Sequence, residues 1–458
     1  MNIIICGAGE VGYSLAKYLS SDNMNVTLID ESSEKLEKIS SLIDVRTLVG
    51  KSYNPEVLSQ ANIEEAELLI SVNENDVINI LTCEISKILF KIPTTIARIK
   101  EKEFLNNKWS ELFSEKGFKV DYIISPEDEV ASMLARLVAV SGAHDLISFA
   151  NDKVRLIGFK LEDDCPVLDT PLKELTELFP NLNTKIVLMV RDEKIMIPNK
   201  MEELVQGDDI YLLSDSNNIE RVLNVFGKKI IKSRRIVIIG AGIIALNIAK
   251  ILEINEPDSS ITIIENNKEI AERAAMQLEK ANVLLGDAVE SEIMQEAEIS
   301  KADIVFSVTD SDEINTLVST LAKKAGTRNC YALLKGDKYL PVISLMDIDG
   351  IISPKELTVS KVLKHIRRGD ISDVYELQAG KAEIIEFLVK EGSQLVGIPL
   401  KEAKLPDNAI IGTVVRDDIV LTPTGDTIIE ARDKVVMCLL HDAIHEIEAF
   451  IADDSELI

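Results

Sequence analysis

The chain has 458 residues, of which 46% are hydrophobic and 28% are charged, so we expect a globular protein with more than one hydrophobic core. Its 50 Lys and Arg residues against 77 Asp and Glu residues give a net charge of -27, which repels nucleic-acid phosphates and excludes nucleic acids as expected partners. The five cysteines form no C-x-x-C pair, so we expect neither a disulfide framework nor a zinc site, as suits a cytoplasmic protein. No apolar run approaches the roughly 18 residues that span a bilayer, so we expect no direct membrane insertion.

Short apolar runs alternate with helical patterns in the first part of the chain. Residues 3–6 and 26–30 are predicted strands, and residues 11–20 and 34–41 are predicted helices. Further strand and helix segments continue the alternation toward Ser125. This alternation predicts a doubly wound parallel sheet of the Rossmann-like kind.

A glycine-rich loop follows the first predicted strand and opens the first helix. It consists of Gly7, Ala8, Gly9, Glu10, Val11 and Gly12, and the acidic residue Asp30 ends the next strand. In a dinucleotide-binding fingerprint the first glycine permits a tight turn, the second lets the main chain approach a pyrophosphate, and the third lets the helix lie close to the sheet. Asp30 should accept hydrogen bonds from ribose hydroxyls, and its charge disfavours a 2′-phosphate. We therefore expect NAD, NADH, ATP or ADP as the ligand, and an empty structural turn is the alternative.

Polar residues also end later strands, at the edge of the sheet where such folds hold ligands. They are Lys51 and Ser52, Asn73 and Glu74, and Arg98. We expect Asn73 to contact the nucleotide; the alternative is that it only caps the following helix. Lys51 or Arg98 could reach a phosphate. The alternative for Lys51 is solvent exposure, and the alternative for Arg98 is an interface or surface ion pair.

A helix over residues 126–140 is expected to lead out of the Rossmann part into a different kind of domain. Ser125 and Pro126 have the residue types of a helix N-cap followed by proline at the first helical position. The segments RLIGFKL, KIVLMV, KIMIP and DIYLLS then predict short strands, and residues 172–178 and 218–225 are predicted helices. This pattern predicts a small α+β domain with an antiparallel sheet.

The second half of the chain repeats the first. The segment IIICGAGEVGYSLAKYL from Ile3 matches IVIIGAGIIALNIAKIL from Ile236, and DYIISPEDEV from Asp121 matches DGIISPKELT from Asp349. Four parts are therefore predicted: a Rossmann domain over residues 1–125, a crossover helix with an α+β domain over residues 126–226, a basic linker from Gly227 with a second Rossmann domain over residues 227–352, and a second crossover helix with an α+β domain over residues 353–458.

The second copy carries its own candidate ligand-binding residues. They are Gly240, Ala241, Gly242 and Ile243 in the loop, Glu265 after the second strand, Asp287 after the third and Thr309 after the fourth. Ala245 stands where the first copy has Gly12, which the fingerprint allows. Thr309, like Asn73, has helix capping as its alternative role.

Residues for catalysis are missing from this pattern. A dehydrogenase needs a proton donor or acceptor, usually His, Lys or Tyr, beside the nicotinamide, and we identify no such constellation. His441 and His445 have the spacing of a metal-binding pair, but the sequence offers no third ligand, so we expect them on a helix surface. We assign no catalytic residue and no metal, and we do not expect an enzyme.

These features together resemble the Trk potassium-uptake regulatory protein family, the TrkA family, whose members carry two tandem regulator-of-potassium-conductance units. The resemblance covers essentially the whole chain. It is carried by GAGEVG from Gly7 with Asp30, the N-E-x-D-x-x-N run from Asn73 to Asn79, IARI ending at Ile99, DYIISPE from Asp121, and the PLKEL and VRD segments of the α+β parts.

The resemblance implies a cytoplasmic homotetramer, peripheral on the inner face of the membrane, that binds NAD or NADH and ATP or ADP and regulates a membrane-embedded potassium transporter subunit. It places nucleotide contacts on Gly7 to Val11, Asp30, Ser52, Asn73, Glu74 and Arg98 in the first copy, and on Gly240 to Ile243, Glu265, Asp287 and Thr309 in the second. An NAD-dependent oxidoreductase and a nucleotide-stabilised scaffold are the alternative functions. Independently of the resemblance, the cytoplasmic loops of membrane proteins carry an excess of Lys and Arg, so complementary charge would steer an acidic chain to them.

Overall fold

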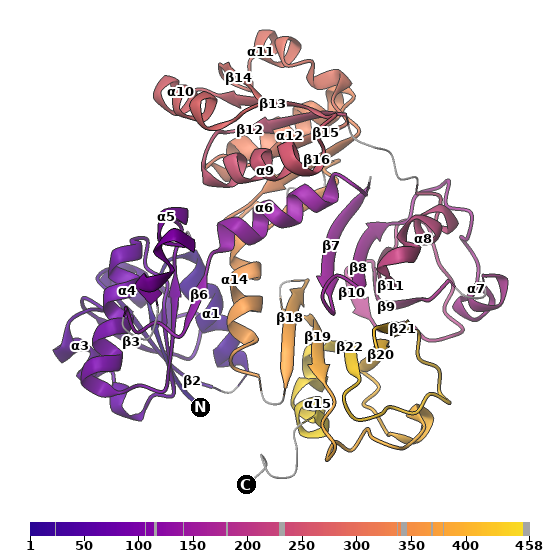
Figure 1. The fold of residues 1–458 in the computed structure, drawn as a ribbon, viewed down its shortest axis with the longest axis horizontal. Coiled ribbons are helices and arrows are strands. Elements are labelled where there is room, and N and C mark those ends of the chain that lie inside the picture. The colour runs from indigo at the N-terminus through magenta and orange to yellow at the C-terminus, as the bar shows by residue number, and fades with distance from the viewer. Residues whose placement is uncertain are drawn as a thin grey trace. The chain divides into compact units, whose positions relative to one another are not determined.

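The computed structural model describes residues 1–22, 24–105, 107–113, 117–140, 142–179, 182–228, 234–336, 338–339, 346–367, 370–378 and 380–451. Residues 229–233, which are most of the predicted linker, and the side chain of His445 lie outside this description. The chain forms two compact units, and Figure 1 labels many of their elements. Unit 1 joins Met1–Glu129 with Pro354–Val362, and unit 2 joins Val130–Ser353 with Leu363–Ile458.

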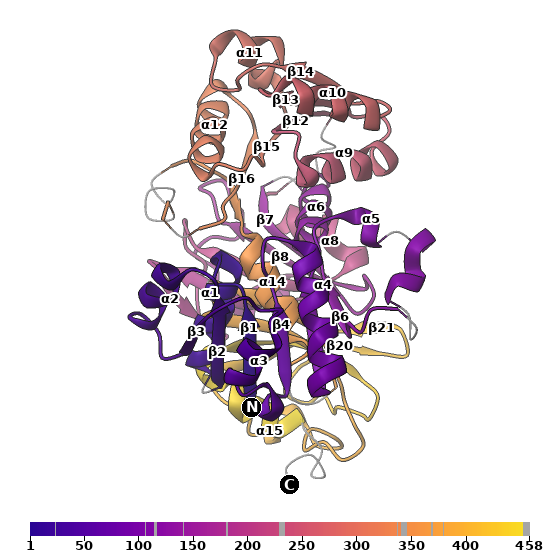
Figure 2. The same cartoon turned by 90° about the vertical axis from the view of Figure 1, so that its left-hand side faces the viewer.

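Unit 1 contains a six-stranded parallel sheet with the strand order β3-β2-β1-β4-β5-β6. Its strands are β1 (Asn2–Cys6), β2 (Asn25–Asp30), β3 (Arg46–Val49), β4 (Leu68–Ser71), β5 (Thr94–Arg98) and β6 (Tyr122–Ile124). The connections contain α1 (Glu10–Ser21), α2 (Ser33–Ser40), α3 (Pro55–Gln60), α4 (Asp76–Ile85) and α5 (Lys102–Leu105). They also contain the 3-10 helices η1 (Ile63–Glu65) and η3 (Asn107–Phe113), and the π-helix η2 (Ser86–Phe90), which continues α4. In the view of Figure 2, strands β1 and β4 are seen between α1 and α4. This order confirms the predicted doubly wound sheet.

The apolar runs of the sequence form this sheet because its central strands are covered on both faces. Every residue of β4 is buried, and so are four of the five residues of β1. Ile4, Ile29 and Leu69, one from each of three neighbouring strands, share a core cluster with Leu58 of α3 and Cys83 of α4. Strands buried on both faces have near-continuous apolar sequences, so the runs could be recognised without the structure.

Unit 2 contains a second parallel sheet with the matching order β14-β13-β12-β15-β16-β17. Its strands are β12 (Arg235–Ile239), β13 (Ser260–Glu265), β14 (Asn282–Leu285), β15 (Ile304–Ser307), β16 (Asn329–Leu333) and β17 (Gly350–Ile352). The connections contain α9 (Ile243–Asn255), α10 (Lys268–Gln277), α11 (Ser291–Glu296), η5 (Ile299–Lys301) and α12 (Asp312–Ala325). The second copy therefore folds as the repeat predicts.

Each Rossmann part is followed by a five-stranded antiparallel sheet, as the α+β interpretation predicts. The first, of order β10-β9-β11-β8-β7, contains β7 (Ala143–Phe149), β8 (Val154–Lys160), β9 (Thr184–Arg191), β10 (Lys194–Met196) and β11 (Asp209–Asp215), with α7 (Leu172–Leu178), η4 (Ser216–Asn218) and α8 (Ile219–Val225). The second, of order β18-β19-β22-β20-β21, contains β18 (Ile371–Leu377), β19 (Ala382–Leu388), β20 (Ala409–Arg416), β21 (Ile419–Leu421) and β22 (Lys434–Leu440), with η6 (Leu400–Glu402), η7 (His441–Ala443) and α15 (Ile444–Ile451). Strands β7 and β18 were not predicted, because polar residues such as His144 and Asp373 interrupt their apolar pattern.

The crossover helices are α6 (Pro126–Leu137) and α14 (Pro354–Leu363). Both begin at the predicted proline, although α6 ends before the predicted residue 140. Ser125 takes the predicted position before the first helical residue, but its Oγ is buried without a hydrogen-bond partner in the described part of the chain and does not cap the helix. The main-chain oxygen of Ser125 accepts the first hydrogen bonds of the helix, from N of Asp128 at 3.2 Å and from N of Glu129 at 3.3 Å.

Within unit 2 the two antiparallel sheets contact each other through β9 and β20 (Figure 1). A Cβ atom added at Gly412 would lie 2.4 Å from Cδ1 of Leu213, so the contact requires glycine there. Nζ of Lys185 donates to the carbonyl oxygens of Ile411 at 3.0 Å and of Pro423 at 3.4 Å. Burial lowers the pKa of Lys185 to about 8. The contact between the sheets thus holds an ammonium group that is poorly hydrated.

A buried ion cluster connects β7 with its neighbours in unit 2. Nε2 of His144 lies 2.5 Å from Oδ1 of Asp209, and Nδ1 lies 3.1 Å from Oδ2 of Asp145. Burial alone would lower the pKa of His144, but the two carboxylates raise it to about 10. The hydroxyl of Tyr375 in β18 donates to Asp145 at 3.1 Å, and the hydroxyl of Tyr331 in β16 donates to a main-chain oxygen of β7 at 2.7 Å. Strand β7 is therefore bonded to both the second Rossmann sheet and the second antiparallel sheet.

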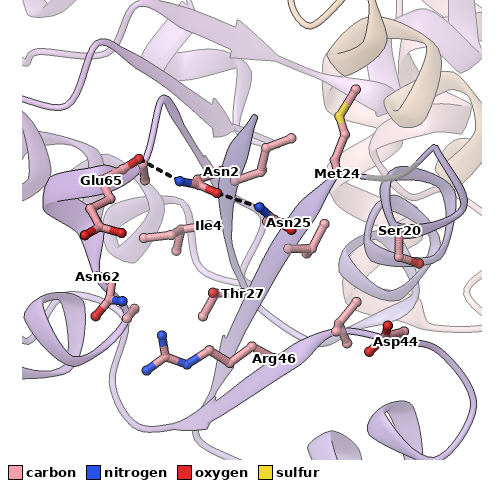
Figure 3. A pocket seen from close by; sticks show the side chains of 15 residues that line it. Asn2, Ile4, Ser20, Met24, Asn25, Thr27, Asp44, Arg46, Asn62 and Glu65 are labelled. Atoms are coloured by element: carbon pink, nitrogen blue, oxygen red, sulfur yellow. Dashed lines mark hydrogen bonds between the residues drawn. The ribbon is translucent and has the colours of Figure 1, made fainter. Parts of the chain in front are cut away.

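A cavity of about 440 Å³ lies at the amino ends of β1, β2 and β3. Figure 3 shows Asn2, Asn25 and Arg46, the first residues of these strands, among the side chains that line it. Nδ2 of Asn25 donates to Oδ1 of Asn2 at 3.0 Å. Doubly wound folds bind their ligands at the opposite, carboxyl edge of the sheet, so this cavity is not the candidate nucleotide site.

Lys185 is expected to make stability depend on pH. Its pKa of about 8 in the folded protein lies below the ordinary value of 10.5, so the unfolded chain binds more protons between these values and stability rises with pH across this window. We expect Lys185→Met to raise the unfolding temperature at neutral pH, and this gain to shrink as the pH approaches about 10. Scanning calorimetry of both proteins across the window measures the difference, and a gain that does not change with pH would contradict this role of Lys185.

Candidate nucleotide-binding sites

The turn between β1 and α1 requires glycine. Gly7 has a φ of 109°, which side-chain-bearing residues rarely adopt, and its N donates to the carbonyl oxygen of Ile29 at 2.8 Å. A Cβ atom at Gly7 would lie only 2.9 Å from N of Asn73. The loop therefore passes directly against the carboxyl end of β4, where the strand order of the sheet reverses.

The second and third glycines of the loop have different environments. A Cβ atom at Gly12 would lie 1.8 Å from the carbonyl oxygen of Gly7, so the first turn of α1 rests on the loop. A Cβ atom at Gly9 would meet nothing within 4 Å. Gly9 is the N-cap of α1, and no side chain accepts a hydrogen bond there. The main chain above Gly9 is thus open beside the first N–H groups of a helix, an environment that stabilises an anionic group.

The second copy repeats this geometry with one difference. Gly240 has a φ of 94°, and a Cβ atom there would lie 3.1 Å from Cγ2 of Thr309. A Cβ atom at Gly242 would meet nothing within 4 Å, as at Gly9. Ala245 replaces the third glycine and is fully buried, so the loop and α9 leave room for one methyl group.

An acidic side chain holds each glycine loop. Oδ2 of Asp30 accepts a hydrogen bond from N of Ala8 at 2.6 Å, and its Oδ1 accepts from N of Ser32 at 2.8 Å. Oε2 of Glu265 accepts from N of Ala241 at 2.8 Å, and its Oε1 accepts from the main chain two residues later at 2.9 Å. A carboxylate has about four acceptor positions, so each retains capacity for the ribose hydroxyls.

Asn73 lies in a polar cluster at the end of β4. Its Nδ2 donates to Oγ of Ser52 and to Oγ of Ser71, each at 3.3 Å, and Ser52 is buried. The N-cap of α4 is Asn75, and the N-cap of α12 is Ser311, so the capping alternative for Asn73 and Thr309 is wrong. Both residues are free of that role and lie against the glycine loop of their copy.

Two asparagines that the sequence reasoning did not select connect the ends of neighbouring strands. Oδ1 of the fully buried Asn79 accepts from N of Asn73 at 2.8 Å, and its Nδ2 donates to the carbonyl oxygen of Arg98 at 2.9 Å. Asn315 bonds in the same way to N of Thr309 at 2.8 Å and to the last residue of β16 at 2.9 Å. A signal was present, because both copies share a D-x-x-N pattern at this helix start.

Arg98 forms an ion pair, but a largely buried one and not the surface pair that was its alternative role. Its NH2 group lies 2.6 Å from Oε1 of Glu127, and the two side chains are only 14% and 12% exposed. Lys51 is exposed, with Nζ 5.9 Å from the centre of the Tyr53 ring. Neither cation is held at the glycine loop in this structure.

The remaining predicted residues divide by exposure. Ala8, Val11 and Ala241 are buried in the loops, whereas Glu10, Glu74 and Ile243 are exposed, Ile243 to 42%. Oδ1 of Asp287 accepts from N of Val289 at 3.1 Å and so shapes the turn after β14. The structure therefore brings together the loop glycines, the strand-end acid and the polar residue after the fourth strand in each copy, and leaves the charged side chains at the rim.

Comparisons with known proteins agree with this architecture. The family described as the TrkA-N domain matches residues 3–126 and 236–354, and the TrkA-C domain family matches residues 156–227 and 384–452. The chain is 37% identical over 448 residues to the Trk system potassium uptake protein TrkA of Azorhizobium caulinodans, with 98% of each chain covered. It is 33% identical to the protein of the same name from Vibrio alginolyticus, again with 98% of each chain covered.

Solved structures share the fold at low sequence identity. The crystal structure of the GsuK RCK domain superposes with a TM-score of 0.63 at 14% identity, covering 98% of this chain and 94% of that one. The GsuK channel bound to NAD gives a TM-score of 0.62 at 14% identity, covering 98% of this chain and 78% of that one. Within the described residues of this chain, no helix combines the length and apolar character needed to cross a membrane.

The two environments of Gly9 and Gly12 predict opposite responses to the same substitution. Gly12→Ala forces a methyl group against the carbonyl oxygen of Gly7, and we expect it to lower the free energy of unfolding by about 2–3 kcal/mol. Gly9→Ala enters open space at an extended residue and should change it by no more than about 1 kcal/mol. Denaturant unfolding monitored by circular dichroism tests this pair, and equal losses in both variants would contradict the described packing.

Proposed function

Because the chain belongs to the TrkA family of Trk-system potassium uptake proteins, we propose that it is the nucleotide-sensing regulatory subunit of such a system. It binds on the cytoplasmic face of the membrane to a membrane-embedded potassium transporter subunit. Nucleotide occupancy of the two Rossmann domains sets its conformation and, through that, the activity of the transporter. The observation that supports this proposal most is the complete glycine-loop site in both copies of the repeat.

The proposed ligands are NAD or NADH and ATP or ADP. The open main chain at Gly9 and Gly242 suits a pyrophosphate, and the carboxylates of Asp30 and Glu265 suit unphosphorylated ribose hydroxyls. Structures of GsuK, which shares this fold, have been solved with NAD and with ADP. One ligand class therefore accounts for both copies.

The two sites differ in charge at their rims. The first has Lys51 and Ser52 after β3, where the second has Asp287 and Ala288. The first helix after each glycine loop begins with Glu10 in α1 and with Ile243 in α9. We therefore expect the two sites to differ in affinity for a given nucleotide, so each must be tested with its own variant.

Regulation requires that the nucleotide bind one conformation more tightly than another, because the free energy available for gating is that difference in binding. The ligand would contact the glycine loop and the residue after the fourth strand, two segments that already touch at Gly7 and Asn73. A ligand that fits these two segments better when they are close together, or when they are further apart, would bind that conformation more tightly.

We also propose that the subunit assembles as a homotetramer. Val77 and Leu81 of α4 and Ile88 of η2 are 59%, 42% and 60% exposed, and their spacing places them along one side of the helix. A row of exposed apolar side chains on one helix suits a protein–protein contact. A second copy of this chain is the occupant that the family membership favours.

Nucleotide binding should show two sites per chain that can be removed one at a time. Asp30→Ala and Glu265→Ala each delete a ribose acceptor, and we expect each to weaken one site by about tenfold or more and to leave the other. Isothermal titration calorimetry with ADP and with NAD measures affinity and stoichiometry. Asp44→Ala is the charge-matched control, because this exposed acid lines the cavity at the opposite edge of the sheet. Full binding by Asp30→Ala and Glu265→Ala would contradict the proposed site.

Docking on the transporter should depend on salt. The net charge of -27 attracts the excess Lys and Arg of cytoplasmic loops, and salt screens this attraction over a Debye length of about 10 Å at 0.1 M. We expect the association rate with the detergent-solubilised membrane subunit to fall markedly between low and high salt, as measured by biolayer interferometry. An association rate that does not change with salt would sink the electrostatic part of the proposal.

A further inference from the structure

A carboxylate at the start of α4 holds the chain that leaves β5. Oδ2 of Asp76, the first residue of the helix, accepts hydrogen bonds from N of Lys100 and from N of Glu101, both at 2.9 Å. Asp76 is 7% exposed, and its other oxygen, Oδ1, is buried without a hydrogen-bond partner among the described residues. A buried carboxylate oxygen without a partner is unfavourable and offsets part of the stability that the two hydrogen bonds to Oδ2 contribute.

One helix turn later, the side chain of Asn79 connects the end of β5 with Asn73, the proposed ligand contact after β4. Its Nδ2 donates to the carbonyl oxygens of Arg98 at 2.9 Å and of Asn73 at 3.0 Å, while its Oδ1 accepts from N of Asn73 at 2.8 Å. The side chains of Asp76 and Asn79 thus connect the residue after β4 with the residues that follow β5. We name this pair the D-x-x-N clasp.

The second copy has a corresponding clasp, in which Asp312 uses both of its carboxylate oxygens where Asp76 uses one. Asp312 accepts from N of Lys335 at 2.9 Å and from N of Gly336 at 3.0 Å. Asn315 donates to the last carbonyl oxygen of β16 at 2.9 Å and accepts from N of Thr309 at 2.8 Å. The residues between Asp and Asn are Val-Ile in the first copy and Glu-Ile in the second. The proposed ligand contact after the fourth strand is Asn73 in the first copy and Thr309 in the second. The contacts are kept although the neighbouring side chains differ.

We propose that the clasp couples each nucleotide site to the chain that leaves the fifth strand of its sheet, with Asp76 and Asn79, and Asp312 and Asn315, as positioning residues. The inference rests on the proposed function, because it takes Asn73 and Thr309 to contact the nucleotide. A ligand that moves or orders Asn73 acts through Asn79 on the main chain at Arg98, and through the same helix turn on the segment that Asp76 holds.

The coupled segment leads toward the crossover helix. After Glu101 the chain continues through α5 and η3 to β6, and from there directly into α6. Charge-assisted hydrogen bonds such as those to Asp76 are roughly twice as strong as neutral ones, which suits a connection that transmits displacement. The clasp therefore joins Asn73, the proposed ligand contact, to the part of the Rossmann domain that precedes the crossover helix α6.

A tryptophan in this segment can report its rearrangement. Trp109 is the single tryptophan of the chain, lies in η3 and is 51% exposed, so its emission is sensitive to rearrangement after β5. The experiment measures tryptophan emission and, on the same samples, calorimetric binding, while ADP or oxidised NAD is added to the full-length protein. Excitation at the long-wavelength edge of the tryptophan band keeps the adenine absorbance of both ligands low.

We expect nucleotide to change the Trp109 emission of the wild-type protein. Asp76→Ala should reduce this change by about threefold or more while altering nucleotide affinity by less than about threefold. Asp76→Asn keeps an oxygen that can accept from Lys100 and Glu101, so it should retain most of the response. Asp312→Ala makes the same change in the second copy, which has no tryptophan, and should leave the emission response at its wild-type size.

An undiminished response in Asp76→Ala, or an equal loss in Asp312→Ala, overturns the proposal. If Asp76→Ala does not fold, Asn79→Asp replaces the amide donor to Arg98 with an oxygen of the same size and should abolish the response in its place. A wild-type protein that binds nucleotide without a change at Trp109 refutes the clasp alone. A wild-type protein that binds neither nucleotide refutes the proposed function itself, so the two failures are distinguishable.

Discussion

The close approach of the glycine loop to the end of the fourth strand is the constraint on which each nucleotide site depends. Gly7 has a positive φ, and a Cβ atom added to it would lie 2.9 Å from N of Asn73. Gly12 lets α1 rest on that turn. Gly240 makes the corresponding approach to Thr309. Because the loop and the strand end touch in both copies, a ligand bound above the loop contacts two parts of the sheet at once.

Much of the fold could be predicted from the sequence because its signals are local. The apolar strands, the glycine turns and the proline at the start of each crossover helix depend on neighbouring residues, and all of them were recognised. Strand β7 was missed because His144 and Asp145 break its apolar pattern, and these largely buried side chains pair with Asp209 and Tyr375. Such partners are distant in sequence, so no local pattern reveals them. The four domain boundaries stay predictions, since the two compact units divide the chain elsewhere.

The candidate sites show the same division. Glycines and acids at fixed spacing identified the loop and its carboxylate, whereas the pairing of Arg98 with Glu127 depends on the path of the chain between them. Asn79 was visible only as part of a repeated pattern, because an asparagine inside a helix start has no single meaning. Its five-way hydrogen bonding, which fixes Asn73 and the end of β5, follows only from three-dimensional contacts.

The central claim is that nucleotide bound at the two glycine loops regulates a potassium transporter. The most direct test is potassium flux into vesicles that contain the membrane subunit of the same Trk system together with this protein, with and without ADP or NAD. The account predicts that nucleotide changes the flux, and that a Gly9→Ala, Gly242→Ala double variant binds the membrane subunit but gives a flux that no longer responds to nucleotide. A flux that is the same with and without nucleotide in the wild-type complex would contradict it.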